Sequence, residues 1–197
     1  MINYPNGKKI NKANNQKDTN KALKAKSISN ANRGMDLEHD INISNEFYVN
    51  AKKAFIYKRP TPINIVKVDY SKGARITDAY FEKQSTTDYN GVYRGRYIDF
   101  EAKATQSKTS FPLSNITKHQ IEHLKNVLSA GGIAFFIVEF TIYNEIFLID
   151  AQYIIDYYEH GERKSITHDD FLKHGHLIKQ SFKPRIDYLP VVDEIYF

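Results

Sequence analysis

The chain has 197 residues, of which 41% are hydrophobic, and this size and composition are typical of one folded domain with its own core. It contains no cysteine, which excludes disulfides, zinc fingers, iron–sulfur clusters and cysteine catalysis. The net charge of +5 is uneven, because residues 1–30 carry seven lysines and one aspartate (+6), which leaves −1 for the remaining residues.

Residues 1–30 are rich in Asn, Lys and Ser and show no apolar periodicity, which predicts a disordered basic tail ahead of a domain at 31–197. This charge asymmetry favours contact with nucleic acid, and a merely solvated leader is an equal alternative. The N-terminus lacks the apolar core of a signal peptide, and the longest apolar run, Ile133–Val138, is too short to span a bilayer. We therefore expect a soluble, cytoplasmic protein with no membrane association.

The first half of the domain reads as one helix followed by strands. Apolar residues at helical spacing predict a helix from about Met35 to Ala51, and a short strand follows at 54–57. Residues 63–81 alternate around a Ser-Lys-Gly turn, which predicts a β-ribbon, and its mixed polar and apolar faces favour projection from the core. Residues 86–103 predict two strands, with Asn90-Gly91 as the turn between them and Gly95 as a residue that could extend it.

The second half predicts a helix that begins at Ser114 or Thr117 and ends at Gly131, then strands at 133–140 and 146–149. A helix is expected at 151–159 and a shorter one at 168–174, followed by irregular chain through Pro184 and Pro190. This order of elements predicts an α/β fold with a central sheet and helices on its faces.

Two acids and a lysine form the central constellation. Period-two alternation after Arg96 places Tyr97, Asp99, Glu101 and Lys103 on one face of a strand, and Ile98, Phe100, Ala102 and Ala104 on the other. If the preceding strand pairs with this one, Asp88 approaches Glu101. Two adjacent carboxylates need a cation between them, and hard oxygen ligands suit Mg²⁺. The Lys103 ammonium would then hold the attacking water or neutralise charge on the phosphate.

These residues resemble the PD-(D/E)xK nuclease pattern, with Asp88 as the upstream acid and Glu101-Ala102-Lys103 as the tripeptide, although Thr87 stands where the pattern has proline. Four wider blocks are similar to the RecU family of Holliday junction resolvases. The blocks are Asn32-Arg33-Gly34-Met35 leading to Leu37-Glu38, Thr86-Thr87-Asp88-Tyr89-Asn90-Gly91, Tyr97 to Lys103, and Phe111-Pro112-Leu113 before the helix with His119-Gln120.

The resemblance implies a restriction-endonuclease-like mixed sheet flanked by helices, with a stalk at about 61–82 that enters the junction. It implies a homodimer that binds four-way DNA junctions and nicks two opposing strands with Mg²⁺ or Mn²⁺, and links to recombinase and branch-migration proteins. By the same resemblance, Asp88 and Glu101 hold the metal with Thr86 and Gln120 in its surroundings, Lys103 stabilises the transition state, and Glu38 is an additional acid near the metal. The expected DNA contacts are Arg33, Lys72, Arg75, Tyr80, Phe81 and Lys108, and phosphate contacts of this kind weaken steeply with salt.

Several alternatives stay open at this stage. Asp88 could be a turn residue, Gln120 could close a capping box with Thr117, Glu38 could be a solvated helix residue, and Tyr80 and Phe81 could belong to the core. Residues 119–123 also fit H-x-x-E-H, the inverted zinc-peptidase signature. At the level of function, the alternatives are a non-catalytic junction-binding or recombinase-modulating protein and a sequence-specific restriction endonuclease on the same core.

Overall fold

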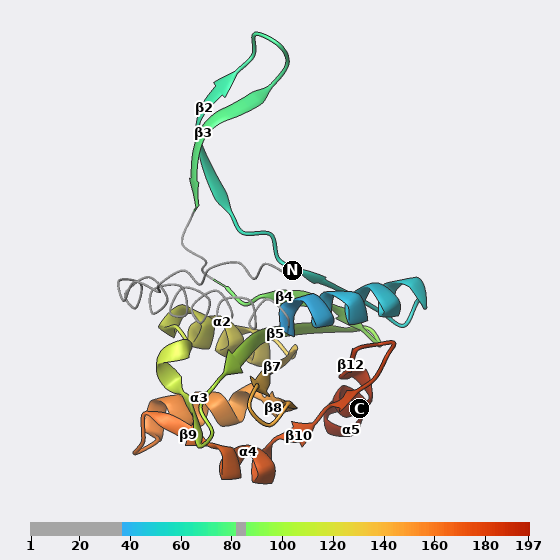
Figure 1. Cartoon of the computed structure of the whole chain (residues 1–197), viewed down its shortest axis with the longest axis vertical. Helices are drawn as coiled ribbons and strands as arrows, with labels where there is room; N and C mark the ends of the chain where they lie inside the picture. Colours follow the sequence, from blue (N-terminus) through green and yellow to red (C-terminus); the bar gives the residue numbers. More distant parts are fainter. Residues whose placement is uncertain (1–36, 82–85) are drawn as a thin grey trace, which may run out of the picture.

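The computed structural model describes residues 37–81 and 86–197, so the expected tail at 1–30 and Arg33 lie outside the described residues. The centre of the molecule is a six-stranded mixed sheet (Figure 1). Its strands, in spatial order, are β1 (Ala54–Lys58), β4 (Tyr89–Tyr93), β5 (Arg96–Thr105), β7 (Ile133–Phe140), β8 (Glu145–Asp150) and β10 (His176–Leu177). Only β5 and β7 run parallel, and all other neighbours are antiparallel.

Helices cover both faces of this sheet, as the sequence predicted. The helix at 37–50 and α5 (Leu189–Tyr196) pack on one face, whereas α2 (Lys118–Ser129), α3 (Ala151–His160) and α4 (His168–His174) pack on the other. A 3₁₀ turn, η1 (Leu113–Asn115), leads into α2, and two small pairs, β6 (Ser110–Pro112) with β9 (Ser165–Thr167) and β11 (Lys179–Gln180) with β12 (Ile186–Asp187), complete the structure. Among the described helices, none has the length and apolar character needed to cross a membrane.

The parallel pair β5–β7 forms the middle of the sheet and explains two sequence patterns. Strand β7 sends Ile133, Phe135 and Ile137 into one core and the residues between them into the other, which is why it reads as a continuous apolar run. Strand β5 buries only its Ile98, Phe100 and Ala102 face in the first core. Its other face is polar and lies against α2, so the acids of β5 are buried by this helix.

Strands β2 (Ile63–Asp69) and β3 (Arg75–Phe81) pair only with each other and project from the body as a ribbon (Figure 1). All seven residues of β3 are exposed, including Tyr80 at 60% and Phe81 at 78%. The alternative that places these two aromatic residues in the core is therefore wrong. Exposed aromatic side chains on a ribbon that packs against no helix form a surface available to a ligand.

The turn expected at Asn90-Gly91 lies elsewhere. Both residues belong to β4, and the chain reverses at Arg94 and Gly95, whose φ angles are 47° and 78°. Gly91 has a different purpose, because a Cβ built on it would lie 2.0 Å from the Phe55 carbonyl oxygen of β1. The glycine therefore allows β1 to approach β4 closely, a requirement that sequence pattern alone cannot distinguish from a turn.

The C-terminal segment is the second difference from the sequence prediction. The chain after Pro184 is not irregular to its end, because α5 runs from Leu189 to Tyr196. Pro190 lies in its first turn, where the missing N–H has no helical partner to lose. Leu189, Val191 and Val192 bury one side of this short helix in the first core.

Replacement of Gly91 by Ala tests the close approach of β1 and β4. We expect Gly91→Ala to lower the free energy of unfolding by about 3 kcal/mol, because the new methyl group overlaps the backbone of β1. The control Gly95→Ala has open space around the new Cβ and is expected to cost about 1 kcal/mol for its positive φ. Urea denaturation measures both values, and equal losses would contradict this role for Gly91.

Candidate active site

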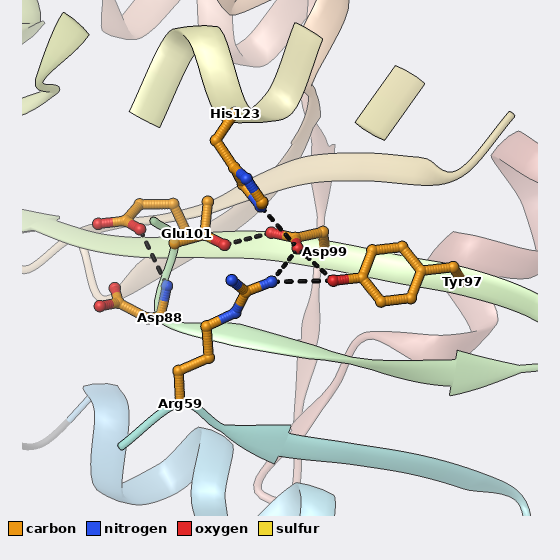
Figure 2. Close-up of polar contacts among 7 residues, drawn as sticks. Arg59, Asp88, Tyr97, Asp99, Glu101 and His123 are labelled. Atoms are coloured by element: carbon orange, nitrogen blue, oxygen red, sulfur yellow. Dashed lines mark hydrogen bonds and ion pairs between the residues drawn. The ribbon is translucent and has the colours of Figure 1, made fainter. Parts of the chain in front are cut away.

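Asp88 and Glu101 lie next to each other on paired strands (Figure 2). Asp88 directly precedes β4, and the pairing of Tyr89 with Phe100 brings it opposite Glu101 of β5. The two residues exchange backbone contacts. The Asp88 N–H donates to Glu101 Oε2 at 3.1 Å, and the Ala102 N–H donates to Asp88 Oδ2 at 3.3 Å. Asp88 is 7% exposed and Glu101 is fully buried, so both carboxyl groups lie largely out of water.

The second Glu101 oxygen has two cationic or polar donors. Oε1 accepts from Lys103 Nζ at 2.6 Å and from Gln120 Nε2 at 2.5 Å. The pKa of Glu101 is nevertheless raised to about 8, first by burial and then by the negative charge of Asp88, while Lys103 acts in the opposite direction. At Glu101, burial and the neighbouring acid therefore outweigh the effect of Lys103, so added positive charge beside this carboxyl group would favour its ionised form.

Gln120 closes the capping box that its sequence position allowed, and it also contacts Glu101. Its backbone N–H donates to Thr117 Oγ1 at 3.3 Å, and its Oε1 accepts from the Thr117 N–H at 2.9 Å, which is a capping box at the start of α2. The amide nitrogen of the same side chain points the other way and bonds Glu101. The cap orients the side chain, so the start of the helix and the acid site share one residue.

Glu38 and Thr86 are less closely attached to the acid pair. Glu38 forms an ion pair with Lys58, and both side chains are partly exposed. The pKa of Tyr89 is raised by burial and then by Glu38, Asp88 and Glu101, so all three acids lie around the same tyrosine. Thr86 is partly exposed, and within the described residues it makes no hydrogen bond to either acid of the pair. The expected contributions of Glu38 and Thr86 to a metal site stay predictions.

Asp99 is the residue that sequence reasoning missed. Alternation placed it on the polar face of β5, but no role followed, because its partners come from distant parts of the chain. It is fully buried and accepts hydrogen bonds from four side chains, as Figure 2 shows in part. These donors are Thr87 on Oδ1, and Arg59, Tyr97 (2.8 Å) and His123 (3.0 Å) on Oδ2. The strand therefore carries a second buried acid, two residues before Glu101, whose charge is paired within the protein.

The zinc-peptidase alternative finds no support in this geometry. His123 contacts Asp99, whereas His119 is exposed. Throughout residues 37–81 and 86–197, no three His, Cys, Asp or Glu residues are grouped so that they could hold a metal by themselves. As expected from their angular separation on a helix, only Gln120 of the pair His119 and Gln120 points at the site.

The acid pair does fit a hard divalent cation. Mg²⁺ is commonly bound through one or two carboxylates, with water and substrate phosphate oxygens as the other ligands, so it does not need three acids from the protein. Asp88 and Glu101 supply oxygen donors side by side, and the raised pKa of Glu101 identifies a position where added positive charge stabilises the ionised form. The Gln120 amide adjoins the same carboxylate.

The candidate DNA contacts lie in two places. Lys72, Arg75, Tyr80 and Phe81 are all exposed on the projecting ribbon. Lys108 is exposed in the loop after β5, where its carbonyl accepts from the Tyr143 hydroxyl at 3.0 Å. The structure thus separates cationic and aromatic residues on the ribbon from the buried acids in the sheet.

The sequence matches a protein-family model described as "RecU: Recombination protein U" over residues 32–194. Relatives from Bacillus cytotoxicus, Bacillus cereus and Bacillus anthracis, each named Holliday junction resolvase RecU, are 49% identical over 201 aligned residues. In each case the match covers 100% of this chain and 98% of the relative. Among solved structures, Archaeoglobus fulgidus Hjc, a Holliday junction resolvase, is similar at a TM-score of 0.40 with 10% identity, over 68% of this chain and 93% of Hjc.

The raised pKa of Glu101 predicts how stability depends on pH when no metal is present. Because the folded-state pKa of about 8 exceeds the ordinary value of 4.5, the folded protein retains a proton that the unfolded chain loses. The free energy of unfolding should therefore fall as the pH rises from about 4.5 to about 8. Glu101→Gln has no carboxyl group to titrate, so its Tm at pH 8 is expected to exceed that of wild type. Each kcal/mol of difference in the free energy of unfolding corresponds to roughly 2–4 °C in Tm.

Thermal melts in EDTA at pH 5 and pH 8 measure the difference. Glu122→Gln, an exposed acid on the same helix as Gln120, is the control and should follow wild type. Addition of Mg²⁺ at pH 8 should raise the Tm of wild type and leave Glu101→Gln unchanged. Parallel pH profiles for wild type and Glu101→Gln would show that the acid pair carries no such electrostatic cost.

Proposed function

This chain belongs to the RecU family, and we propose that it is a Holliday junction resolvase that uses Mg²⁺, or Mn²⁺ in its place, to nick two opposing strands of a four-way DNA junction. The similarity to the named relatives extends over the whole chain, so the proposal applies to the domain and its ribbon together. Hydrolysis of a phosphodiester is the reaction for which acids, a lysine and a hard cation are commonly combined.

The observation that carries the proposal is the buried pair of Asp88 and Glu101 with the Lys103 ammonium 2.6 Å from Glu101. Lys103 pairs with Glu101, and Asp88 lies against the same carboxylate. Asp99, the third acid of the neighbourhood, is paired with Arg59. The two acids and the lysine that the nuclease pattern requires are therefore in contact at one place in the sheet.

In the proposed reaction, Asp88 and Glu101 hold the cation, and the Gln120 amide fixes the orientation of the Glu101 carboxylate. Bound Mg²⁺ would make a water nucleophilic at neutral pH and polarise the scissile phosphate. The Lys103 side chain is 25% exposed, so its ammonium lies at the boundary between the buried acid and solvent. From there it can donate to a phosphate oxygen as negative charge develops, at little cost in reorganisation.

The ribbon supplies the proposed selectivity for branched DNA. A duplex arm offers only its outer backbone, whereas the open centre of a four-way junction can admit a narrow two-stranded element. Tyr80 and Phe81 can stack on unpaired or terminal bases, and Lys72 and Arg75 can contact phosphates. These contacts read shape and charge, so they need no base-specific hydrogen bonds.

A homodimer completes the proposal. A junction is close to two-fold symmetric, and a two-fold dimer would present two identical acid sites to equivalent strands, which accounts for paired nicks. Contacts with recombinase and branch-migration proteins are part of the same proposal. The competing proposal is a junction-binding protein without catalysis. Such a protein would need the ribbon but would not need Asp88, Glu101 and Lys103 together.

Cleavage of a synthetic four-way junction by wild type and Asp88→Asn tests the proposed reaction. We expect wild type with Mg²⁺ to nick opposing strands symmetrically and to leave a linear duplex of the same sequence intact. Asp88→Asn should lower the cleavage rate by at least about a hundredfold, since it removes one ligand of the proposed metal. Junction binding, measured by gel shift in EDTA, should be retained by the variant.

Asp156→Asn on α3 is a matched control that changes an aspartate outside the acid site and should cleave like wild type. Tight junction binding by wild type with no cleavage at any Mg²⁺ or Mn²⁺ concentration would favour the non-catalytic alternative. Equal cleavage of junction and duplex would instead refute selectivity for structure.

Substitutions on the ribbon test how the junction is bound. Tyr80→Ala is expected to weaken junction binding by about tenfold, the loss of one stacked base, with little effect on duplex binding. Arg75→Ala should reduce the slope of log affinity against log salt by about 1, because one phosphate contact disappears. Fluorescence anisotropy between 50 and 200 mM salt gives both quantities. The exposed Phe182→Ala, outside the ribbon, is the control for loss of an aromatic side chain.

A further inference from the structure

We propose that Asp99 is a positioning residue for the acid pair, which acts by holding Thr87, His123 and Arg59 in fixed places around Asp88 and Glu101. The inference rests on the proposed function, since it assigns Asp99 a purpose in the metal-dependent reaction. Asp99 does not itself face the metal or the DNA, because its two oxygens are occupied by side chains of this protein.

Burial and charge make Asp99 a firm anchor. Its carboxylate is fully buried, and a buried carboxylate is stable only when it is paired and hydrogen-bonded. Arg59 supplies the positive charge, and Thr87, Tyr97 and His123 occupy further acceptor positions (Figure 2). Among the described residues, Thr87 is the one side-chain donor to Oδ1, so loss of its hydroxyl would leave this buried oxygen without that bond, whereas Oδ2 has three donors.

Three of the four partners of Asp99 are connected to the acid site through the neighbouring backbone or through helix α2. Thr87 is the residue before Asp88, and the Arg59 N–H donates to the Asp88 carbonyl oxygen at 2.7 Å. His123 lies on α2, nearly one turn after Gln120, which bonds Glu101. Asp99 itself is two residues before Glu101 on β5. The carboxylate therefore joins the end of β1, the turn at 86–88 and helix α2 to the strand that carries Glu101.

The turn at 86–88 is where such an anchor is needed. Residues 86–88 precede β4 and lie outside its ladder, so strand pairing alone does not fix the Asp88 side chain. When Glu101 is ionised, its negative charge repels Asp88 and favours outward movement of residues 86–88. The hydrogen bond from Thr87 to Asp99 opposes this movement and keeps Asp88 beside Glu101.

The test compares Thr87→Val with Thr87→Ser in the full chain. Valine keeps the shape of threonine but cannot donate to Asp99, whereas serine keeps the hydroxyl. Isothermal titration calorimetry with Mn²⁺ measures metal affinity without any need for cleavage. We expect Thr87→Val to bind Mn²⁺ about tenfold more weakly than wild type, and Thr87→Ser to lie within about twofold of it. Half-maximal cleavage should require a correspondingly higher Mn²⁺ concentration in Thr87→Val.

Two further variants separate positioning from stability. Ile155→Val removes one methyl group from a buried side chain of α3, so it should reduce Tm without changing Mn²⁺ affinity. Asp99→Asn keeps the shape of the anchor but removes its charge, and it should weaken Mn²⁺ binding as Thr87→Val does. It replaces Thr87→Val if circular dichroism shows that variant to be unfolded.

The measured Mn²⁺ affinities decide whether Asp99 positions the acid pair. Wild-type Mn²⁺ affinity in Thr87→Val or Asp99→Asn, or an equal loss in Ile155→Val, would overturn the positioning role. If wild type binds Mn²⁺ but does not cut junctions, the proposed function fails, and the affinities of the variants still decide whether Asp99 positions the acids. If wild type binds no Mn²⁺, there is no metal site to position, and both proposals fall.

Discussion

Mutual repulsion between the buried carboxyl groups of Asp88 and Glu101 is the constraint around which the surrounding contacts are arranged. Water would screen two such charges at the surface, but here the protein replaces water with a lysine, an amide and backbone N–H groups. That replacement is incomplete, as the pKa of about 8 for Glu101 shows. In the domain without a bound cation, a proton on Glu101 therefore relieves the repulsion below about pH 8.

The central sheet makes this arrangement sustainable. Strand β5 is paired on both sides, with β4 and with β7, and its apolar face is buried in the core formed with the 37–50 helix and α5. A strand held in this way cannot move to relieve repulsion on its other face. The same rigidity would give the proposed reaction fixed positions for Glu101 and Lys103, which is what electrostatic catalysis requires.

Much of this arrangement could be predicted from sequence because it depends on local periodicity. The alternation from Tyr97 to Lys103 identified the polar face of β5. The capping signals left Ser114 and Thr117 as alternatives for the start of α2, and the structure has Thr117 as the cap. The parts that could not be predicted depend on contacts between distant segments. Gly91 resembles a turn residue until β1 is placed beside it, and Asp99 resembles a surface acid until Arg59, Thr87 and His123 converge on it. Tyr80 and Phe81 are aromatic, as many core residues are, so their sequence alone suggests burial. Their exposure follows from the two-stranded ribbon on which they lie, which belongs to a separate sheet from the core of the domain.

The side chain of Gln120 has a consequence for local unfolding. One end of its amide closes the first turn of α2, and the other end holds Glu101. Helix ends are the places where native proteins open most readily, and the amide protons released there exchange with solvent. Fraying at Thr117–Gln120 therefore removes one of the contacts that hold the Glu101 carboxylate, while Lys103 and the Asp88 N–H keep theirs. A ligand that binds the folded acid site would in turn slow exchange at the helix start.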